Sequence, residues 1–330
     1  MSADPENIGA ILADFVEEAG RLILPLWRTA LTVDAKADDS PVTEADRQGE
    51  ILITRLLAER FPEIPVIGEE HASEYGTPDE IGPRFFLVDP VDGTKAFVRG
   101  DPSWTVNIGL IQDRHPVAGA VCMPASGETW FTSASGALKR VHGAPAQACR
   151  VRPWPQGQAV ALISHTMKEE TTRKLAETYR FDTTLAMDSS VKLCRIAEGS
   201  ADIYPRHGPT SEWDIAAAQA VLQGAGGTVL TPEGTPFLYG KADEQFRNGW
   251  FVARGGSPTC DLPPLYGEGQ TRCYGAITPI TIVTKSAFSL RFPYGERDHP
   301  TRRGRAACPS CADPQASGDR WPRKAGPARA

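Results

Sequence analysis

Apolar residues recur at helical spacing near the start of the chain. Between Asn7 and Trp27 they fall three and four positions apart, which predicts an amphipathic helix. A polar loop from Asp34 to Pro41 follows, and the helical spacing then returns from Thr43 until the chain approaches Pro62. Thr43, with Asp46 three residues later, is typical of a helix N-terminus whose side chains cap one another. We therefore expect two helices that flank a charged loop.

The middle of the chain has the shorter patterns of β-strands. Five apolar or β-branched runs, separated by turn residues, predict a sheet. They are Pro65–Gly68, Phe85–Asp89, Thr105–Gln112, Val117–Met123 and Thr129–Ser133.

After a stretch rich in proline, glutamine and glycine, strands and helices alternate. The expected strands are Val160–Ser164, Asp202–Pro205 and Thr228–Leu230. The expected helices are Lys168–Tyr179, Val191–Gly199 and Asp214–Ala225. This alternation is typical of an α/β arrangement, and the whole pattern predicts a layered α/β (α+β) fold.

The pattern changes again at Gly256. Beyond Leu290 no apolar period is sustained, and the closing residues hold too few aliphatic side chains to build a core. We therefore expect one domain over residues 1–255, with an N-terminal half of residues 1–150 and an α/β half of residues 151–255. Residues 256–330 are expected to form a disordered basic appendage, which is either a genuine extension or a reading-frame artefact.

Composition places the chain among globular proteins. Of its 330 residues, 41% are hydrophobic and 23% are charged, which supplies enough apolar side chain for a core and argues against wholesale disorder. The N-terminus has no basic segment followed by an apolar one, and no run approaches about 18 apolar residues. The seven cysteines are an odd number scattered over a long chain, so a secreted disulfide framework is not expected. We expect a cytoplasmic monomer or homodimer that does not insert into a membrane.

Charge is divided unevenly along the chain. Residues 1–255 hold 24 basic and 35 acidic residues, whereas residues 256–330 hold 11 and 6. An acidic body binds a polyanion poorly unless its carboxylates are gathered around metal ions. We therefore expect no nucleic-acid polymer as a partner of this body, and its acidic residues become candidate metal ligands.

The densest group of candidate ligands is the run DPVDGT that begins at Asp89, at the end of an apolar strand. Asp89 and Asp92 lie three residues apart with proline in the turn between them, so both carboxylates can approach one hard cation. The Val91 carbonyl is a further oxygen ligand, and Gly93 and Thr94 can present backbone N–H groups to a phosphate. Taken alone, the run is also explained as a strand-to-helix turn with an aspartate cap.

Two more acidic residues follow similar local patterns. Glu69 comes directly after the apolar strand that ends at Gly68, and Asp214 lies in the first turn of the alanine-rich helix. Each has a simpler explanation, namely an acidic turn in solvent for Glu69 and an ordinary helix N-cap for Asp214. No cluster of cysteine and histidine residues competes with these carboxylates as a metal site.

Together these motifs resemble the three metal-binding motifs of the inositol monophosphatase superfamily. They are Gly68–Glu70, the DPVDGT run, and Trp213-Asp214 followed by alanines and closed by Gly226-Gly227. Their order and separations agree, and the resemblance covers about residues 9–254. It implies the αβαβα sandwich of that superfamily for residues 1–255, and the activity of a phosphoric monoester hydrolase.

The resemblance also implies two or three Mg²⁺ ions. Glu69, Asp89 and the Val91 carbonyl would hold the first ion. Asp89, Asp92 and Asp214 would hold the second. Oxygen ligands suit Mg²⁺, and two cations can clamp the attacking and leaving oxygens of an in-line displacement. Li⁺ is expected to inhibit by replacing one of the cations.

The catalytic residues that the resemblance implies are Glu69, Thr94 and Asp46. A metal-activated water would attack phosphorus directly, positioned by Glu69 and Thr94, with Asp46 completing a hydrogen-bond relay to Thr94. In agreement, the chain has neither a Gly-x-Ser-x-Gly motif nor a cysteine phosphatase loop. The run from Lys36 to Asp46 resembles the mobile catalytic loop of the superfamily, although a helix-capping turn also explains it.

Further segments resemble the bacterial 3'(2'),5'-bisphosphate nucleotidases of this superfamily. They are Lys95–Phe97, Thr105–Leu110, Asp188–Cys194 and Ala201–Arg206. This resemblance implies hydrolysis of the 3'-phosphate of adenosine 3',5'-bisphosphate to AMP and phosphate. The substrate contacts that it implies are Gly93, Thr94, His165, Ser189, Lys192 and Arg206. Simpler interpretations make Lys192 a solvated residue of its helix and His165 a hydrogen-bonding residue at a strand end.

Other activities stay open. An inositol monophosphatase usually has an acidic residue seven positions before the metal-binding aspartate, where this chain has His207. This difference favours a nucleotide over inositol phosphate but leaves histidinol phosphate and fructose bisphosphate as alternative substrates. A catalytically silent protein that binds nucleotides or RNA, with the basic residues 256–330 as the contact, is the alternative from a different class.

Overall fold

The computed structural model describes residues 8–29, 33–35, 41–142 and 144–256. All of these residues belong to one compact unit of the chain. The expected appendage over residues 256–330 lies outside the described residues except for Gly256. Residues 36–40 of the expected catalytic loop also lie outside them.

The first two helices lie where the apolar spacing predicts them. α1 spans Ile8–Ile23 and α2 spans Glu44–Arg60. α1 ends earlier than expected because Pro25 has no N–H for the helical hydrogen bond, and Leu24–Leu26 form a 3₁₀ turn instead. The expected loop between the helices contains a short antiparallel pair, β1 (Val33–Ala35) and β2 (Pro41–Thr43).

A seven-stranded sheet follows, in which the strands lie in chain order. Its strands are β3 (Val66–Gly68), β4 (Arg84–Asp92), β5 (Thr105–Gln112), β6 (His115–Met123), β7 (Glu128–Ser133), β8 (Gly136–Val141) and β9 (Gln147–Cys149). β3 is parallel to β4, and every other pair is antiparallel. The sequence predicts the first five strands but not β8 and β9, because these last two strands have few buried residues and therefore a weak apolar pattern.

The second sheet has five strands in the order β11-β10-β12-β16-β14. They are β10 (Val160–Ile163), β11 (Thr183–Ala186), β12 (Ile203–Arg206), β14 (Thr228–Leu230) and β16 (Phe251–Arg254). β10, β11 and β12 are parallel, whereas β16 is antiparallel to both of its neighbours. All four residues of β11 are exposed, so its sequence has no apolar signal that predicts a strand.

The remaining elements connect and cover the sheets. The longer helices are α5 (Glu169–Tyr179) and α7 (Glu212–Gly224), and the shorter ones are α3 (Glu69–Tyr75), α4 (Thr94–Arg99), α6 (Val191–Ala197) and the 3₁₀ turn η3 (Ala242–Glu244). A second short antiparallel pair joins β13 (Thr210–Ser211) to β15 (Arg247–Asn248). Among the described residues, no helix has the length and apolarity that crossing a membrane requires.

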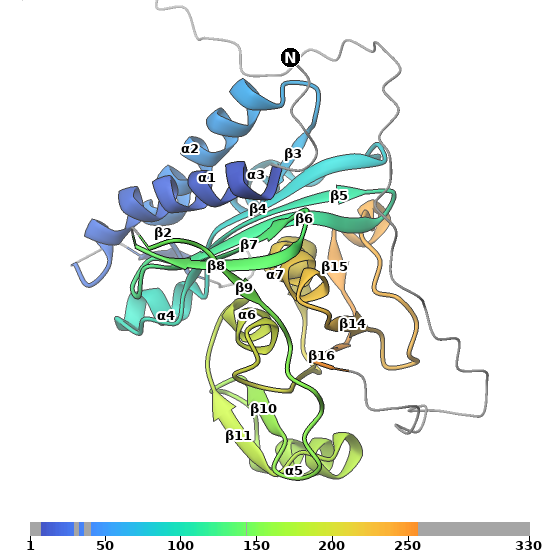
Figure 1. The fold of residues 1–330 in the computed structure, drawn as a ribbon. Coiled ribbons are helices and arrows are strands. Elements are labelled where there is room, and N and C mark those ends of the chain that lie inside the picture. The colour runs from blue at the N-terminus through green and yellow to red at the C-terminus, as the bar shows by residue number, and fades with distance from the viewer. Residues whose placement is uncertain (1–7, 30–32, 36–40, 143, 257–330) are drawn as a thin grey trace, which may run out of the picture. The chain divides into compact units, whose positions relative to one another are not determined.

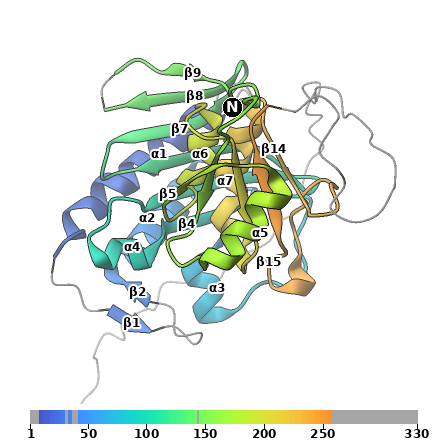
Figure 2. The same cartoon turned by 90° about the horizontal axis from the view of Figure 1, so that it is seen from below.

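Alternating side chains of β4 show how the layers form. Phe86 and Val88 pack with α1 and α2, whereas Phe85 and Leu87 belong to the core that contains α6 and α7. The second sheet lies on the other side of α6 and α7, and its far face packs against α5 through a core that includes Val252. The layers are therefore α, β, α, β, α, as the resemblance implies (Figure 1; Figure 2).

The alanines of α7 allow the central helix to lie very close to the first sheet. A Cβ atom on Gly109 of β5 would lie 2.8 Å from the backbone nitrogen of Ala217, and one on Gly119 of β6 would collide with the Ala217 backbone. Glycine on the strands and alanine on the helix thus permit a separation that larger side chains would prevent. This packing fixes the start of α7, and with it Asp214, relative to β4 and β5.

Candidate metal and phosphate site

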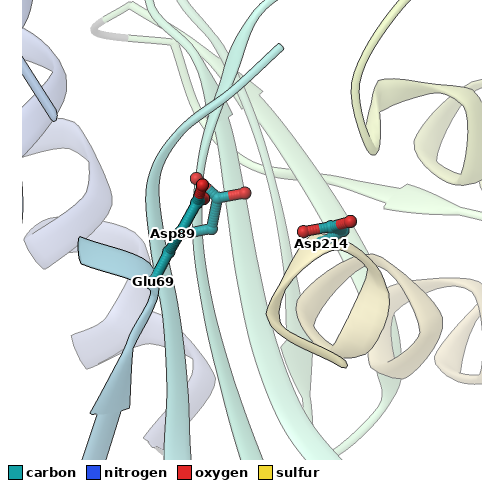
Figure 3. Close-up of side chains that lie close together, drawn as sticks. All are labelled: Glu69, Asp89 and Asp214. Carbon is teal, nitrogen blue, oxygen red and sulfur yellow. The ribbon is translucent and has the colours of Figure 1, made fainter. Parts of the chain in front are cut away.

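Three acidic side chains from separate elements converge in the structure. One oxygen atom from each of Glu69, Asp89 and Asp214 lies within 4.8 Å of the others (Figure 3). Among the described residues, no other group of histidine, cysteine, aspartate and glutamate is comparably close. The structure thus brings together three of the carboxylates that the sequence predicts as metal ligands.

Glu69 is placed by a buried glutamate that the sequence analysis does not identify. Glu50 of α2 accepts hydrogen bonds from the backbone N–H groups of Glu70 and His71, both at 2.7 Å, and so occupies the N-terminus of α3. Gly68 is required here because a Cβ atom would lie 2.6 Å from Glu50 Oε1. Glu69 therefore begins a helix and is not part of an acidic turn in solvent.

A sequence signal for Glu50 does exist. Asp46, Glu50, Ile53 and Leu57 are all buried residues of α2, and their spacing places them on one face of the helix. Charged residues on an otherwise apolar face are unusual and require a partner inside the protein. The spacing of the acidic residues on this face of α2 could therefore identify them, from the sequence, as candidates for the site.

A β-bulge turns Asp89 and Asp92 toward the same region. β4 continues to Asp92 instead of ending at Asp89, and its pairing with β5 shifts between these two residues. Residues three apart in a regular strand face opposite sides, but one extra residue in the strand removes this difference. Asp89 is 1% exposed, and its Oδ1 accepts the Val91 N–H at 3.0 Å. The turn that the sequence predicts after Asp89 is therefore a bulge within the strand.

Burial and mutual repulsion act on the carboxylates of this site. Burial raises the pKa of Asp92 to about 6, against the opposing influence of the Lys192 ammonium and a short hydrogen bond from the Ser190 N–H. Burial also raises the pKa of Asp214 well above its usual range, and the neighbouring Asp92 and Glu69 raise it further. The site thus concentrates negative charge that a bound cation would neutralise.

Asp214 is held by a capping box at the start of α7. Ser211 is the N-cap, and its backbone N–H donates to Asp214 Oδ2 at 2.8 Å. The helix therefore begins at Glu212, and the expectation that Asp214 is the N-cap is wrong, because Asp214 occupies the third helical position. Asn248 Nδ2 donates to the Ser211 carbonyl at 2.7 Å, which anchors the box to β15.

The Thr94 hydroxyl lies within hydrogen-bond distance of two acceptors. It lies 3.3 Å from Asp46 Oδ1 and 3.1 Å from the Val91 carbonyl, so these two acceptors compete for one hydrogen. Asp46 is fixed by the capping box of α2, in which Oδ2 accepts the Thr43 N–H at 2.8 Å and the Thr43 hydroxyl at 2.6 Å. The capping and catalytic interpretations of this segment are therefore compatible.

Gly93 forms the turn from β4 into α4. Its φ of 91° is in the left-handed region, and a Cβ atom would lie only 3.2 Å from the Ser103 carbonyl. α4 begins at Thr94, and the first turn of any helix leaves backbone N–H groups without intrahelical partners. The turn can therefore present such groups beside the carboxylates.

Lys192 is buried, which overturns its interpretation as a solvated residue of the helix. Its side chain points inward, where Nζ donates to the Ser189 carbonyl at 2.6 Å and lies 5.0 Å from the centre of the Tyr204 ring. Burial lowers the pKa of Lys192 to about 8, although Asp92 favours the charged form. Through its hydrogen bond to the Ser189 carbonyl, Lys192 stabilises the turn before α6, where Ser189 has a φ of 57°.

Polar residues that the sequence analysis does not assign hold the same turn against β5. Ser190 Oγ donates to Asn107 Oδ1 at 2.6 Å and lies 3.0 Å from Thr105 Oγ1. All three side chains are buried, and the Ser190 N–H reaches Asp92. A polar residue at alternate positions of an apolar strand, as in Thr105 and Asn107, is the sequence signal for this network.

Two other expected substrate contacts lie near the site. His165 Nδ1 lies 3.4 Å from Asp188 Oδ2, which also pairs with Arg99 at 2.7 Å. Arg206 donates from Nη2 to the Pro209 carbonyl at 2.9 Å, and its charge lowers the pKa of both Asp92 and Asp214. Arg99 and His165 thus share the Asp188 carboxylate.

The Arg206 guanidinium also has an unused donor. Its Nε is buried and has no hydrogen-bond partner among the described residues. A buried donor without a partner is costly.

Comparison with known proteins agrees with this arrangement. Residues 4–254 match the model of the inositol monophosphatase family. The 3'(2'),5'-bisphosphate nucleotidase CysQ of Salmonella typhimurium is 36% identical over 230 residues, covering 69% of this chain and 92% of that protein. The histidinol-phosphatase of Mycobacterium tuberculosis is 32% identical over 246 residues, covering 73% and 92%. The crystal structure of CysQ from Bacteroides thetaiotaomicron has a TM-score of 0.62 and 29% identity, covering 77% of this chain and 98% of that one.

Proposed function

Because the chain belongs to the inositol monophosphatase family, we propose that it is a Mg²⁺-dependent enzyme that removes the 3'-phosphate of adenosine 3',5'-bisphosphate. The family and the nucleotidase relatives make the chain a phosphoric monoester hydrolase, whereas the metal and the substrate are the proposed parts. The observation that supports the proposal most strongly is the convergence of Glu69, Asp89 and Asp214 within 4.8 Å, beside several basic side chains.

The donor set fits a hard divalent cation. Its side-chain ligands are carboxylates alone, and the raised pKa of Asp214 and Asp92 shows that the surrounding protein leaves part of their charge uncompensated. Oxygen-only ligands suit Mg²⁺, and we propose two or three such ions, with Li⁺ as an inhibitor that replaces one of them. The proposed ligands are Glu69, Asp89, the Val91 carbonyl, Asp92 and Asp214. When bound, the ions would neutralise phosphate charge and activate water.

Side chains around the carboxylates would place the reacting groups. Glu69 and the Thr94 hydroxyl orient the attacking water, and Asp46 keeps the Thr94 hydroxyl in place by accepting its proton in a hydrogen bond. The Gly93 turn directs backbone N–H groups toward the phosphate. Rate enhancement would then come from positioning and from charge neutralisation, without a covalent intermediate.

The basic side chains favour a substrate with a second phosphate. His165, Lys192 and Arg206, together with Ser189, are proposed to surround the nucleotide. Arg206 has a buried donor without a protein partner, which a phosphate oxygen could use. Lys192 would contribute by holding the Ser189 turn and by its positive charge. The 36% identity with a bisphosphate nucleotidase supports the same substrate.

Histidinol phosphate is the second candidate substrate, since a histidinol-phosphatase is 32% identical to this chain. Such a substrate carries one phosphate and needs fewer cations than the site provides. We therefore rank it behind the bisphosphate. We further propose residues 1–255 as the phosphatase domain, a cytoplasmic location, and a monomer or homodimer.

A phosphate-release screen tests the proposal. The purified protein would be assayed with Mg²⁺ on adenosine 3',5'-bisphosphate, inositol 1-phosphate, histidinol phosphate and fructose 1,6-bisphosphate. We expect the highest kcat/KM for the adenosine bisphosphate, with AMP as the product. A higher value for histidinol phosphate would identify the alternative substrate, and failure to hydrolyse any of the four would contradict the proposed activity.

A further inference from the structure

A stacked aromatic pair lies at the end of β12, where His207 follows Arg206 in the chain. The rings of His207 and Trp250 lie 4.6 Å apart with an interplanar angle of 13°, so they are nearly parallel. Tyr179 supports the pair from α5, since its hydroxyl lies 3.3 Å from His207 Nε2 and its ring meets the imidazole edge-on at 90°. Trp250 nevertheless remains 55% exposed, although its ring could be buried with a large gain in free energy.

The pair belongs to one edge of the second sheet. β11, β10 and β12 are parallel, so their carboxyl ends share an edge, and Asp188, His165 and His207 follow these ends. β16 is antiparallel to β12, with Arg206 opposite Phe251, so Trp250 precedes β16 at the same edge. In open α/β sheets this is the edge at which ligands bind.

The pair is linked to the carboxylates through residues near it in the chain. Trp250 comes two residues after Asn248, whose side chain holds the Ser211 carbonyl at 2.7 Å. Ser211 in turn caps the helix that carries Asp214. Arg206, the residue before His207, lies close enough to Asp92 and Asp214 to lower the pKa of both. The pair is therefore adjacent in the chain to two groups that are in contact with the carboxylate site or influence it.

We propose that the stacked rings of His207 and Trp250 form the surface against which the base of a nucleotide substrate lies. The inference rests on the proposed function and deepens it, because the base belongs to the phosphate ester that the carboxylate site hydrolyses. A flat, uncharged aromatic surface at the sheet edge where Arg206 ends β12 suits a ligand that joins a planar base to a phosphate. It gives no comparable advantage to inositol phosphate, which has no aromatic ring.

Burial agrees with an uncharged imidazole in this stack. Partial burial of the imidazole lowers the pKa of His207, so the ring is neutral near pH 7. The Tyr179 hydroxyl is its polar partner, and Trp250 covers one of its faces. Trp250 is the more exposed ring. Its removal should therefore weaken ligand binding without disturbing the core.

Two substitutions at one position test the inference. Trp250→Ala removes the exposed ring, whereas Trp250→Phe keeps an aromatic face and serves as the matched control. For each protein, calorimetry in the presence of Mg²⁺ would measure the Kd of AMP and of ribose 5-phosphate, which lacks the base. Stacking of a base on an aromatic side chain corresponds to about 5- to 100-fold in affinity. Thermal unfolding of each variant verifies that it is folded.

We expect Trp250→Ala to reduce the preference for AMP over ribose 5-phosphate by about tenfold, and Trp250→Phe to keep most of it. An unchanged preference in folded Trp250→Ala, or no preference in the wild type, would overturn the inference. The outcome is separable from the proposed activity. If the wild type does not hydrolyse adenosine 3',5'-bisphosphate but its preference for AMP depends on Trp250, the proposed substrate is wrong and the aromatic surface stands.

Discussion

Two helices of this protein begin with the same local structure, and each places an aspartate at the site. The two aspartates face different groups. Thr43 and Asp46 form a capping box at the start of α2, and Ser211 and Asp214 form another at the start of α7. In each box the N-cap N–H donates to Oδ2 of the aspartate at 2.8 Å. One carboxylate oxygen is thus used to cap the helix in both cases.

The surroundings of the two aspartates differ. Asp46 is 1% exposed and its Oδ1 lies 3.3 Å from the Thr94 hydroxyl, so it faces a hydrogen-bond donor. Asp214 faces the carboxylates of Glu69 and Asp89, and burial, followed by repulsion from Asp92 and Glu69, raises its pKa. A capping box therefore fixes a carboxylate at the start of a helix, and the groups opposite decide whether it positions a hydroxyl or holds a cation.

Substitution of Asp214 should have the largest effect. Asp214→Asn keeps an oxygen that can accept the Ser211 N–H, so α7 should still be capped, but it removes a charge from the proposed metal ligands. We expect kcat to fall by about 10²-fold or more for every phosphomonoester that the wild type hydrolyses. Steady-state kinetics at saturating Mg²⁺ would measure this loss. A normal kcat would remove Asp214 from the set of ligands.

The corresponding change in the other box should cost less. Asp46→Asn weakens the acceptor for the Thr94 hydroxyl without touching a proposed ligand, and we expect kcat to fall by about tenfold. The apparent Kd for Mg²⁺, measured by titrating activity, should stay within about twofold of the wild type. A loss of Mg²⁺ affinity as large as that of Asp214→Asn would show that the two boxes do not have the separate roles proposed here.

Proton competition provides a third, smaller effect. A ligand must be deprotonated to hold a cation, and the pKa of Asp92 is raised to about 6. Protonation of Asp92 alone should therefore weaken Mg²⁺ affinity by up to about tenfold as the pH falls from 6 to 5. An ordinary aspartate would cause no change in this range. Activity titrations with Mg²⁺ at each pH would show the difference.

The same shift has a consequence for metal-free stability. Below about pH 4 both the folded and the unfolded chain hold the Asp92 proton, and between pH 4 and 6 the folded state alone keeps it. In chelator, the contribution of Asp92 to the free energy of unfolding should thus be present at low pH and be lost as the pH rises through 6. Asp92→Asn should abolish this part of the pH dependence. If the free energy of unfolding of Asp92→Asn varied with pH as in the wild type, the effect would belong to another group.

Truncation should have the smallest effect, because both boxes and all proposed ligands precede residue 255. A chain that ends at Gly256 keeps the hydrogen bond from the Gly256 N–H to the Arg152 carbonyl at 3.2 Å. We expect its kcat, KM and midpoint of thermal unfolding to match those of the full chain. Loss of folding or of activity would place residues beyond 256 within the functional protein.

Sequence predicts those parts of the site that depend on local patterns. Asp89 and Asp92 follow an apolar strand, and Thr43 with Asp46 has the spacing of a capping box, so neighbouring residues are sufficient to identify them. The five layers follow from the resemblance of several such motifs to one superfamily.

The contributions that sequence does not predict come from residues far apart in the chain. Glu50 reaches the N-terminus of a helix that begins almost 20 residues later, and its spacing shows only that it is buried. The β-bulge depends on the register of β4 against β5. The inward direction of Lys192 depends on the carbonyl of Ser189 and the ring of Tyr204. These features arise from packing, which no local pattern describes.

The most direct test of the account is the location of a bound metal ion. Crystals grown with Mn²⁺ in place of Mg²⁺ would give anomalous scattering peaks that identify the ion without reference to any model of the site. The account predicts one peak bounded by Glu69, Asp89 and the Val91 carbonyl, and a second bounded by Asp89, Asp92 and Asp214. Strong peaks elsewhere, with none at these carboxylates in an active protein, would contradict it.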